Sequence, residues 1–208
     1  MLLRSVHRLG TFRAARSTLP LSLALYAMTK IDLAIKDIDH AFSQLEFAIR
    51  IMCYCELNHL DKEKFDNDIL IELPNENMHF QNGSFKNQES IVIASQMLVG
   101  TAFGVSAIIL DAGYDAANIK KNIKSRDSYS DLRVLVYMVR CAFAHNMADP
   151  KWDARGIDFA RQFNLNLDHS TQIDLTNLNG HSFEYEHIGG FTQWFKIKDA
   201  VVRSLNGI

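Results

Sequence analysis

The apolar positions between residues 30 and 58 follow a helical repeat. Seven of them alternate spacings of four and three, and together they form one continuous stripe. They are Ile31, Ile35, Ile38, Phe42, Leu45, Ile49 and Met52. Polar and charged residues occupy the positions between them. The pattern predicts a long amphipathic helix over residues 30–58, one stave of a helical bundle.

A second, more apolar helix is expected after an irregular excursion. Residues 59–89 contain Pro74, Gly83 and many asparagines, and they predict only a short strand at Ile69–Leu73. Residues 91–110 then run without a charge, which predicts a helix from about residue 87 to about residue 113. Its length and its Gly100–Gly104 pair also suit a membrane span. No flanking Lys/Arg cluster or aromatic belt supports a span, so we favour the buried central helix of a soluble bundle.

The rest of the chain predicts shorter elements. A short helical segment is expected at 116–123, and a third long helix from Ser128, in a capping-box pattern, to about Asn146. Residues 152–163 suggest a further helix despite Gly156. Alternation over 171–190, centred on Asn179-Gly180, predicts a hairpin, and a final helix is expected over 192–205.

Composition describes an ordinary globular protein. The chain has 208 residues, of which 48% are apolar and 22% charged, and its net charge of −2 provides no global basic field. Three cysteines cannot complete a disulfide framework, which favours reduced thiols and a cytoplasmic location. Residues 1–27 hold four arginines and no acid, so they resemble a targeting segment or precede a true start at Met28. We therefore divide the chain into this extension, a mainly α up-down bundle at 28–168, and a hairpin with a terminal helix at 169–208.

The segment "VYMVRCAFAHN" contains the most informative chemistry. Arg140 and His145 stand in an otherwise apolar stretch at the end of the third helix. An arginine supplies a planar fork for phosphate oxygens, and a histidine titrates near neutral pH, so the pair suits the handling of an RNA phosphodiester. Five residues correspond to about 500° on a helix, so the two side chains should point about 140° apart unless the helix end loosens.

This Arg-x4-His spacing at the end of a third helix resembles the signature of the HEPN superfamily, Arg-x4–6-His in an all-α bundle. The chain is similar to uncharacterised, partly plasmid-borne bacterial HEPN-like proteins over residues 28–165. The resemblance implies a metal-independent endoribonuclease of a toxin–antitoxin, defence or stress system, with an antitoxin or regulatory partner. His145 would act as general base or acid and Arg140 would stabilise the phosphorane. It also implies a homodimer whose two motifs line one cleft.

One position departs from the family pattern. Active members carry a polar residue directly after the arginine, and this chain has Cys141. Asn146 would then substitute for that polar group, or only cap the helix. Cys141 favours the alternative function, a catalytically silent HEPN-type module for dimerisation or regulation.

Structural roles compete with the functional ones at each position. Arg140 would pair with Glu46 or Asp111, and His145 would bond the last helix carbonyls. Trp152 would stack on a base or, as we favour, close the end of the bundle. Lys120, Lys121, Lys124 and Arg126 form the best local basic patch for RNA phosphates, or a solvated loop. His181 and His187 lack a third ligand, so we predict no metal and no cofactor.

Overall fold

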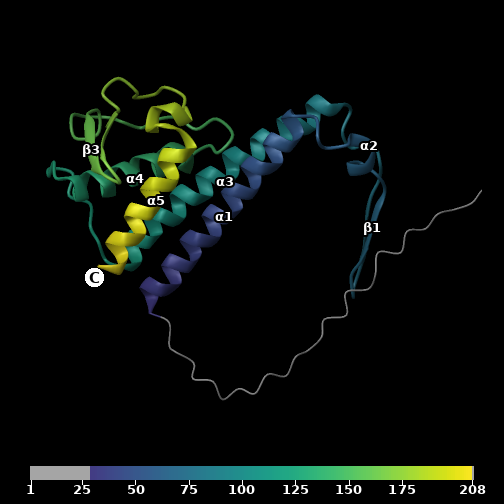
Figure 1. Cartoon of the computed structure of the whole chain (residues 1–208), viewed down its shortest axis with the longest axis horizontal. Helices are drawn as coiled ribbons and strands as arrows, with labels where there is room; N and C mark the ends of the chain where they lie inside the picture. The colour runs from purple at the N-terminus through teal and green to yellow at the C-terminus, as the bar shows by residue number, and fades with distance from the viewer. Residues whose placement is uncertain (1–28, 208) are drawn as a thin grey trace, which may run out of the picture.

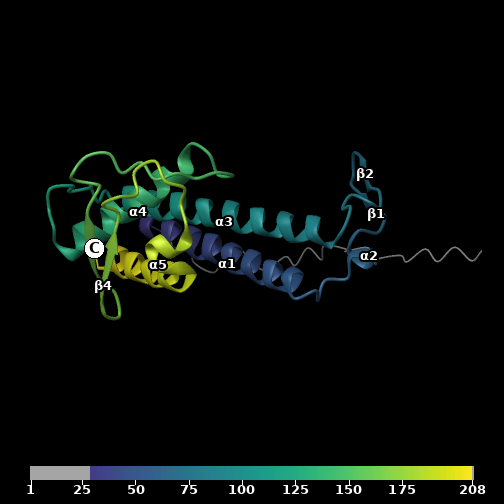
Figure 2. The same ribbon diagram turned by 90° about the horizontal axis from the view of Figure 1, so that it is seen from above.

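Two long helices form the spine of the molecule. The computed structural model describes residues 29–207, so the N-terminal extension predicted for residues 1–27 lies outside the described residues. α1 spans Lys30–Glu56 and begins with a capping box formed by Thr29 and Asp32. α3 spans Gln88–Ala116 and begins with another, formed by Asn87 and Ser90. The two helices pack side by side in opposite directions (Figures 1 and 2).

Two further helices complete the body around the inner half of this spine. α4 spans Ser128–Ala144, and the side chain of Asp127 accepts a hydrogen bond from the Ser130 amide to cap it. α5 spans Gly190–Asn206, after a 3-10 turn at Tyr185–Ile188. α3 contacts α1, α4 and α5, so the core lies around its inner half. The mainly helical fold class, the three long helices and the terminal helix are confirmed.

Two small antiparallel hairpins accompany the helices. At the outer end of the spine, α2 (Lys62–Phe65) leads into β1 (Ile69–Glu72), which pairs with β2 (Asn77–Phe80). The short strand predicted there is thereby confirmed. In the body, β3 (Gln162–Asn166) pairs with β4 (Ser170–Asp174) and packs on α4. Phe163 and Leu165 of β3 point into the core, while their neighbours along the strand are exposed.

The helix predicted over residues 116–123 is wrong. α3 ends at Ala116, and Asn118 adopts a left-handed backbone with φ of 57° that starts a loop. The Ile119 carbonyl accepts a hydrogen bond from Nε of the buried Arg133 (3.2 Å). The Ile119 carbonyl thus accepts a hydrogen bond from a residue of α4. A local sequence pattern does not reveal such a tertiary contact.

The helix predicted over residues 152–163 is also wrong. Gly156 adopts φ of 86°, which interrupts a right-handed helix, and the last residues of the segment belong to β3. The predicted hairpin around Asn179-Gly180 is wrong as well. Gly180 forms a left-handed turn, but its amide donates to the Trp152 carbonyl (2.8 Å), so this turn pairs with the loop after α4. The hairpin of this region lies earlier in the chain, where β3 pairs with β4.

The prediction of a buried central helix is confirmed for only part of α3. Val99, Phe103 and Leu110 are buried, whereas Ile93 and Met97 near the outer end are exposed. Among the described residues, α3 is the helix that is long and apolar enough to cross a membrane, and 44% of its most apolar window is buried. Its packing inside the body is compatible with a soluble protein.

Candidate functional site

The motif lies at the C-terminal end of α4, where the chain turns sharply. α4 ends at Ala144, and His145 follows as an exposed cap residue. The side-chain oxygen of Asn146 accepts hydrogen bonds from the amides of Ala148 (3.0 Å) and Asp149 (3.3 Å). Asn146 therefore stabilises the turn after the helix, while His145 occupies the cap position itself.

The loop after this turn is fixed by the C-terminal part of the chain. The Lys151 amide donates to the Ala142 carbonyl (3.2 Å), and the Phe183 amide donates to the Pro150 carbonyl (2.9 Å). The Trp152 amide donates to the His181 carbonyl (2.9 Å). Segments about 30 residues apart in the sequence thus build one wall behind the end of α4.

Trp152 fills the space behind that wall. Its side chain is 2% exposed, its ring lies against Phe183, and its Nε1 donates to Nδ1 of His187 (3.1 Å). The same Nδ1 accepts from the Glu184 amide (3.1 Å), so the ring of His187 carries its proton on Nε2. This is the packing role that we favoured for Trp152, and the buried ring offers no face to a base.

A pocket of about 360 Å³ opens beside His145. It is lined by Ala142, His145, Asn146, Asp149, Lys151, Trp152, Asp153, Asn179 and Gly180. The structure therefore brings together three of the predicted site residues, namely His145, Asn146 and Trp152. It adds Lys151, a cation that the motif does not include and that follows it by only six residues.

Charges around the pocket are balanced in pairs. Lys151 Nζ lies 3.1 Å from an oxygen of Asp149, and Arg155 Nε lies 2.6 Å from an oxygen of Asp153. The hydrogen bond from Arg155, with a smaller contribution from the charge of His145, lowers the pKa of Asp153. Both carboxylates that line the pocket are therefore paired with cations.

Arg140 lies apart from this pocket. Its side chain is 41% exposed, and its Nε is 3.9 Å from an oxygen of Asp111 on α3. Asp111 makes a closer ion pair with the buried Arg133, and Glu46 pairs with Arg50 instead. Of the two suggested partners, Asp111 is therefore the one in contact. No hydrogen bond or ion pair links the described side chains of Arg140 and His145.

Cys141 faces Tyr137 and not the pocket. A hydrogen bond with Cys141 is the main cause that raises the pKa of the Tyr137 hydroxyl. Lys121 places its Nζ 4.0 Å from the centre of the Tyr137 ring, on the same side of α4. The position directly after the arginine thus contributes to packing along the helix.

The basic patch gathers near the other end of α4. Lys124 Nζ and Arg126 Nη2 both pair with Asp158, at 2.7 Å and 3.3 Å, and Lys120 is exposed. α4 has 17 residues, so its two ends are about 25 Å apart. The structure does not bring these cations to the pocket, although an extended RNA strand spans such a distance in several nucleotides.

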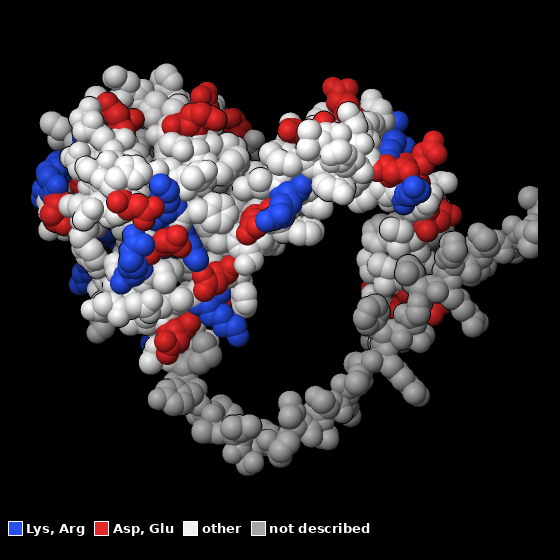
Figure 3. Space-filling view, viewed as in Figure 1, with Lys and Arg blue, Asp and Glu red and all other residues white. Residues whose placement is uncertain are grey.

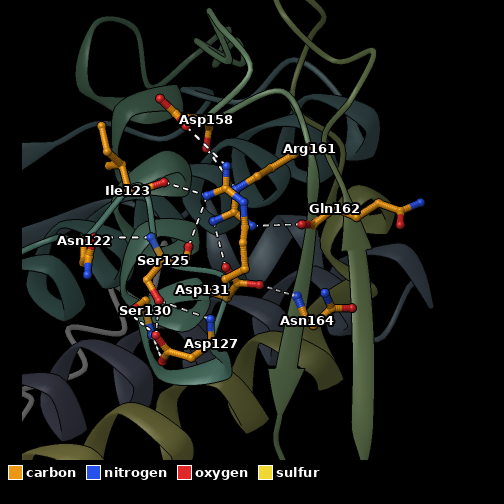
Figure 4. A network of polar contacts seen from close by, with 11 residues as sticks. Asn122, Ile123, Ser125, Asp127, Ser130, Asp131, Asp158, Arg161, Gln162 and Asn164 are labelled. Carbon is orange, nitrogen blue, oxygen red and sulfur yellow. Dashed lines mark hydrogen bonds and ion pairs between the residues drawn. The ribbon is translucent and has the colours of Figure 1, made fainter.

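Sequence patterns did not identify the buried ion pair that fixes β3 to α4. Arg161 Nη2 lies 2.7 Å from Asp131 Oδ1, and Asp131 Oδ2 accepts from the Asn164 amide (2.7 Å; Figure 4). Arg161 also donates to the carbonyl oxygens of Asp158 and Gln162. Both charged side chains are buried, and each neutralises the charge of the other, so this network is structural.

Residues 29–207 contain no group of three or more His, Cys, Asp or Glu side chains placed to hold a metal ion. Comparisons with protein-family models, with curated proteins and with solved structures each found no match to this chain. The geometry of the site is therefore the basis for a functional proposal.

Proposed function

We propose that this protein is a HEPN-like up-down bundle that binds RNA and cleaves it without a metal ion at the end of α4. The proposal depends mainly on His145, the titratable member of the Arg-x4-His motif, which faces the 360 Å³ pocket beside Lys151. An exposed imidazole next to a flexible cation, in a pocket, is suited to proton transfer at a phosphodiester.

The proposed reaction uses the RNA as its own nucleophile. His145 accepts the proton of the 2′-hydroxyl, whose oxygen attacks the adjacent phosphorus. The bond from phosphorus to the 5′-oxygen breaks, which leaves a 2′,3′-cyclic phosphate, and the departing 5′-oxygen takes up a proton from water. Lys151 supplies positive charge beside the phosphorane, and the half-exposed Arg140 reaches a neighbouring phosphate by leaving its long contact with Asp111.

Cleavage of RNA by the purified protein in EDTA tests the proposal. His145→Ala should lower the rate by about 100-fold or more, because it removes the general base. The control is His181→Ala, whose exposed side chain follows the pocket residue Gly180 but does not line the pocket. A substrate with a 2′-deoxy group at the scissile position should resist cleavage. Equal loss in both histidine variants would contradict the assignment.

The alternative function is a catalytically silent module for dimerisation or regulation. Two observations favour it: Cys141 occupies the position after the arginine and faces Tyr137, and Arg140 contacts Asp111. Absence of cleavage by the wild-type protein across tRNA, mRNA and structured RNAs would support this alternative. An antitoxin or other regulatory protein would then be the partner to seek.

A further inference from the structure

The outer half of the α1–α3 pair projects beyond the body and ends in the β1–β2 hairpin (Figures 1 and 2). We define the arm as residues 45–57, the end of α1 with its cap residue, together with residues 88–101 of α3, and the tip hairpin as β1 with β2. Figure 3 shows few charged side chains along the visible face of the arm and open space between the arm and the tip hairpin. The arm is therefore solvated on surfaces that carry little charge.

α1 has a second apolar stripe in addition to the one that packs on α3. Phe47, Ile51, Tyr54 and Leu57 are separated by four, three and three residues, so they share one face. Tyr54 follows the buried Leu45 by nine residues, which places it about 180° around the helix. Phe47, Tyr54 and Leu57 are each at least 57% exposed. The outward face of α1 thus also carries an apolar stripe along the arm.

α3 also exposes apolar side chains to solvent along the arm. Its residues from 90 to 110 include no charged side chain, and Ile93, Met97 and Leu98 are 42–61% exposed. A helix that is apolar on all sides is normally surrounded by other elements. In the body α4 and α5 pack on α3, whereas along the arm α1 is the described helix that lies beside it.

The tip hairpin has the same property. All eight residues of β1 and β2 are exposed, among them Leu70, Ile71 and Phe80. A two-stranded hairpin alone is marginally stable in water and normally packs on another surface. This hairpin therefore presents apolar side chains that no described element of its own chain buries.

We infer that the arm and tip hairpin form a docking surface for a second copy of this chain. Half-exposed large apolar side chains expose roughly 100 Å² each, so the six on the arm offer about 600 Å², and the hairpin offers a similar area. A stable interface needs about 800 Å² per partner, an area that the arm and the hairpin reach when they are buried together.

A two-fold arrangement covers the three surfaces together. The α1 stripe packs against the same stripe of the second copy, as an isologous contact requires. Each tip hairpin then lies over the outer face of the second copy's α3. A membrane is a poorer occupant, because α1 carries the Glu46–Arg50 ion pair and Glu56 along the arm, and Gln96 donates to Glu56.

The test is the mass of the full chain in solution, measured by sedimentation across a concentration series. The wild type should be a dimer. Phe47→Glu with Tyr54→Glu, and separately Leu70→Glu, should each weaken association by about 30-fold or more, as expected for centrally buried contacts. The control is Ile157→Glu, because Ile157 is 82% exposed on the body, outside the arm, and its replacement should leave the mass unchanged.

Circular dichroism melting should show that the monomeric variants retain the helical fold, because every replaced side chain is exposed in one copy. A monomeric wild type would overturn the inference, as would a dimer that the arm and hairpin variants leave intact. Flotation of the wild type with phospholipid vesicles, lost in the arm variants, would also overturn it in favour of a membrane. The outcome does not depend on RNA cleavage, since no pocket residue is changed.

Discussion

At the residue scale, Asp111 has the most consequential environment near the motif helix. It pairs with Arg133, which is 1% exposed, and it also contacts Arg140. Arg133 has a second carboxylate partner, Asp115 (3.0 Å), but that side chain is 69% exposed. The guanidinium of Arg133 also lies over the Tyr114 ring, and its side chain is almost completely shielded from solvent. The inner carboxylate is thus the main compensation for a buried charge.

Asp111→Ala should lower the free energy of unfolding by about 3–5 kcal/mol, because the exposed Asp115 then remains as the carboxylate that balances the buried guanidinium. Asp115→Ala should cost less than about 1 kcal/mol, as is usual for an exposed ion pair. Urea unfolding of both variants measures the difference. Similar losses in the two variants would show that burial does not distinguish the carboxylates.

Asp127 caps α4 and should make stability depend on pH. Hydrogen bonds from Ser125 and from Ser130 hold the pKa of its carboxyl well below the usual range. The pKa of Asp127 is lower in the folded state than in the unfolded state, where it is about 3.9. The carboxylate therefore stabilises the fold at pH values above about 3.9. That contribution is lost as the pH falls from the unfolded value through the folded one.

Asp127→Ala should destabilise the protein by about 1 kcal/mol at neutral pH, while Asp127→Asn keeps a capping oxygen and should cost less. The stability difference between the wild type and the Asn variant should shrink as the pH falls below ~4. Thermal melts at a series of acidic pH values would reveal this convergence. A difference that stays constant with pH would mean that the charge of Asp127 has no part in the cap.

At the element scale, the two glycines of the Gly100–Gly104 pair have different surroundings. A Cβ at Gly104 would lie 2.8 Å from Cδ1 of Phe143, so the glycine lets α4 approach α3 closely. A Cβ at Gly100 would meet only the Tyr185 hydroxyl, at 4.0 Å. The spacing that suits a membrane helix dimer therefore serves, at one of its two positions, packing inside the body.

Gly104→Ala should destabilise the protein by about 1–3 kcal/mol, because Phe143 must shift in a packed core. Gly100→Ala should be neutral or stabilising by up to about 1 kcal/mol, since alanine favours the helix. Denaturant midpoints with equal slopes would report both changes. A comparable loss for Gly100→Ala would indicate that this glycine also lies against a neighbour, as in a helix dimer.

At the scale of the whole molecule, the proposed cleavage pocket and the proposed docking surface are built from different residues. The pocket at the end of α4 is completed by the tail, through the pairing of residues 150–152 with residues 180–183. The arm and tip hairpin extend beyond the region where α4 and α5 cover the spine (Figure 1), and the residues that line the pocket belong to neither. The assay for His145 and the mass measurement on the arm variants therefore test separable parts of the protein.

The sequence determined the helices that have their own local signals. α1, α3, α4 and α5 follow from apolar periodicity, and α4 also from its N-terminal cap, which depend on residues within a few turns. The motif positions of Arg140 and His145, and their divergence on the helix, were also predictable, since helical geometry fixes the angle between them.

Only the tertiary structure decided the conformation of the irregular segments and the set of residues that lines the pocket. The 152–163 segment and the Asn179-Gly180 turn have helical and hairpin patterns, yet their backbone groups pair with distant partners such as Trp152 and Leu175. Lys151 lines the pocket, and Arg140 lies beside Asp111 of another helix. Both positions result from contacts between separate elements. Every buried polar group needs a partner, and the partner is whichever group the fold brings next to it. A local sequence pattern does not identify that partner, because it lies far away along the chain.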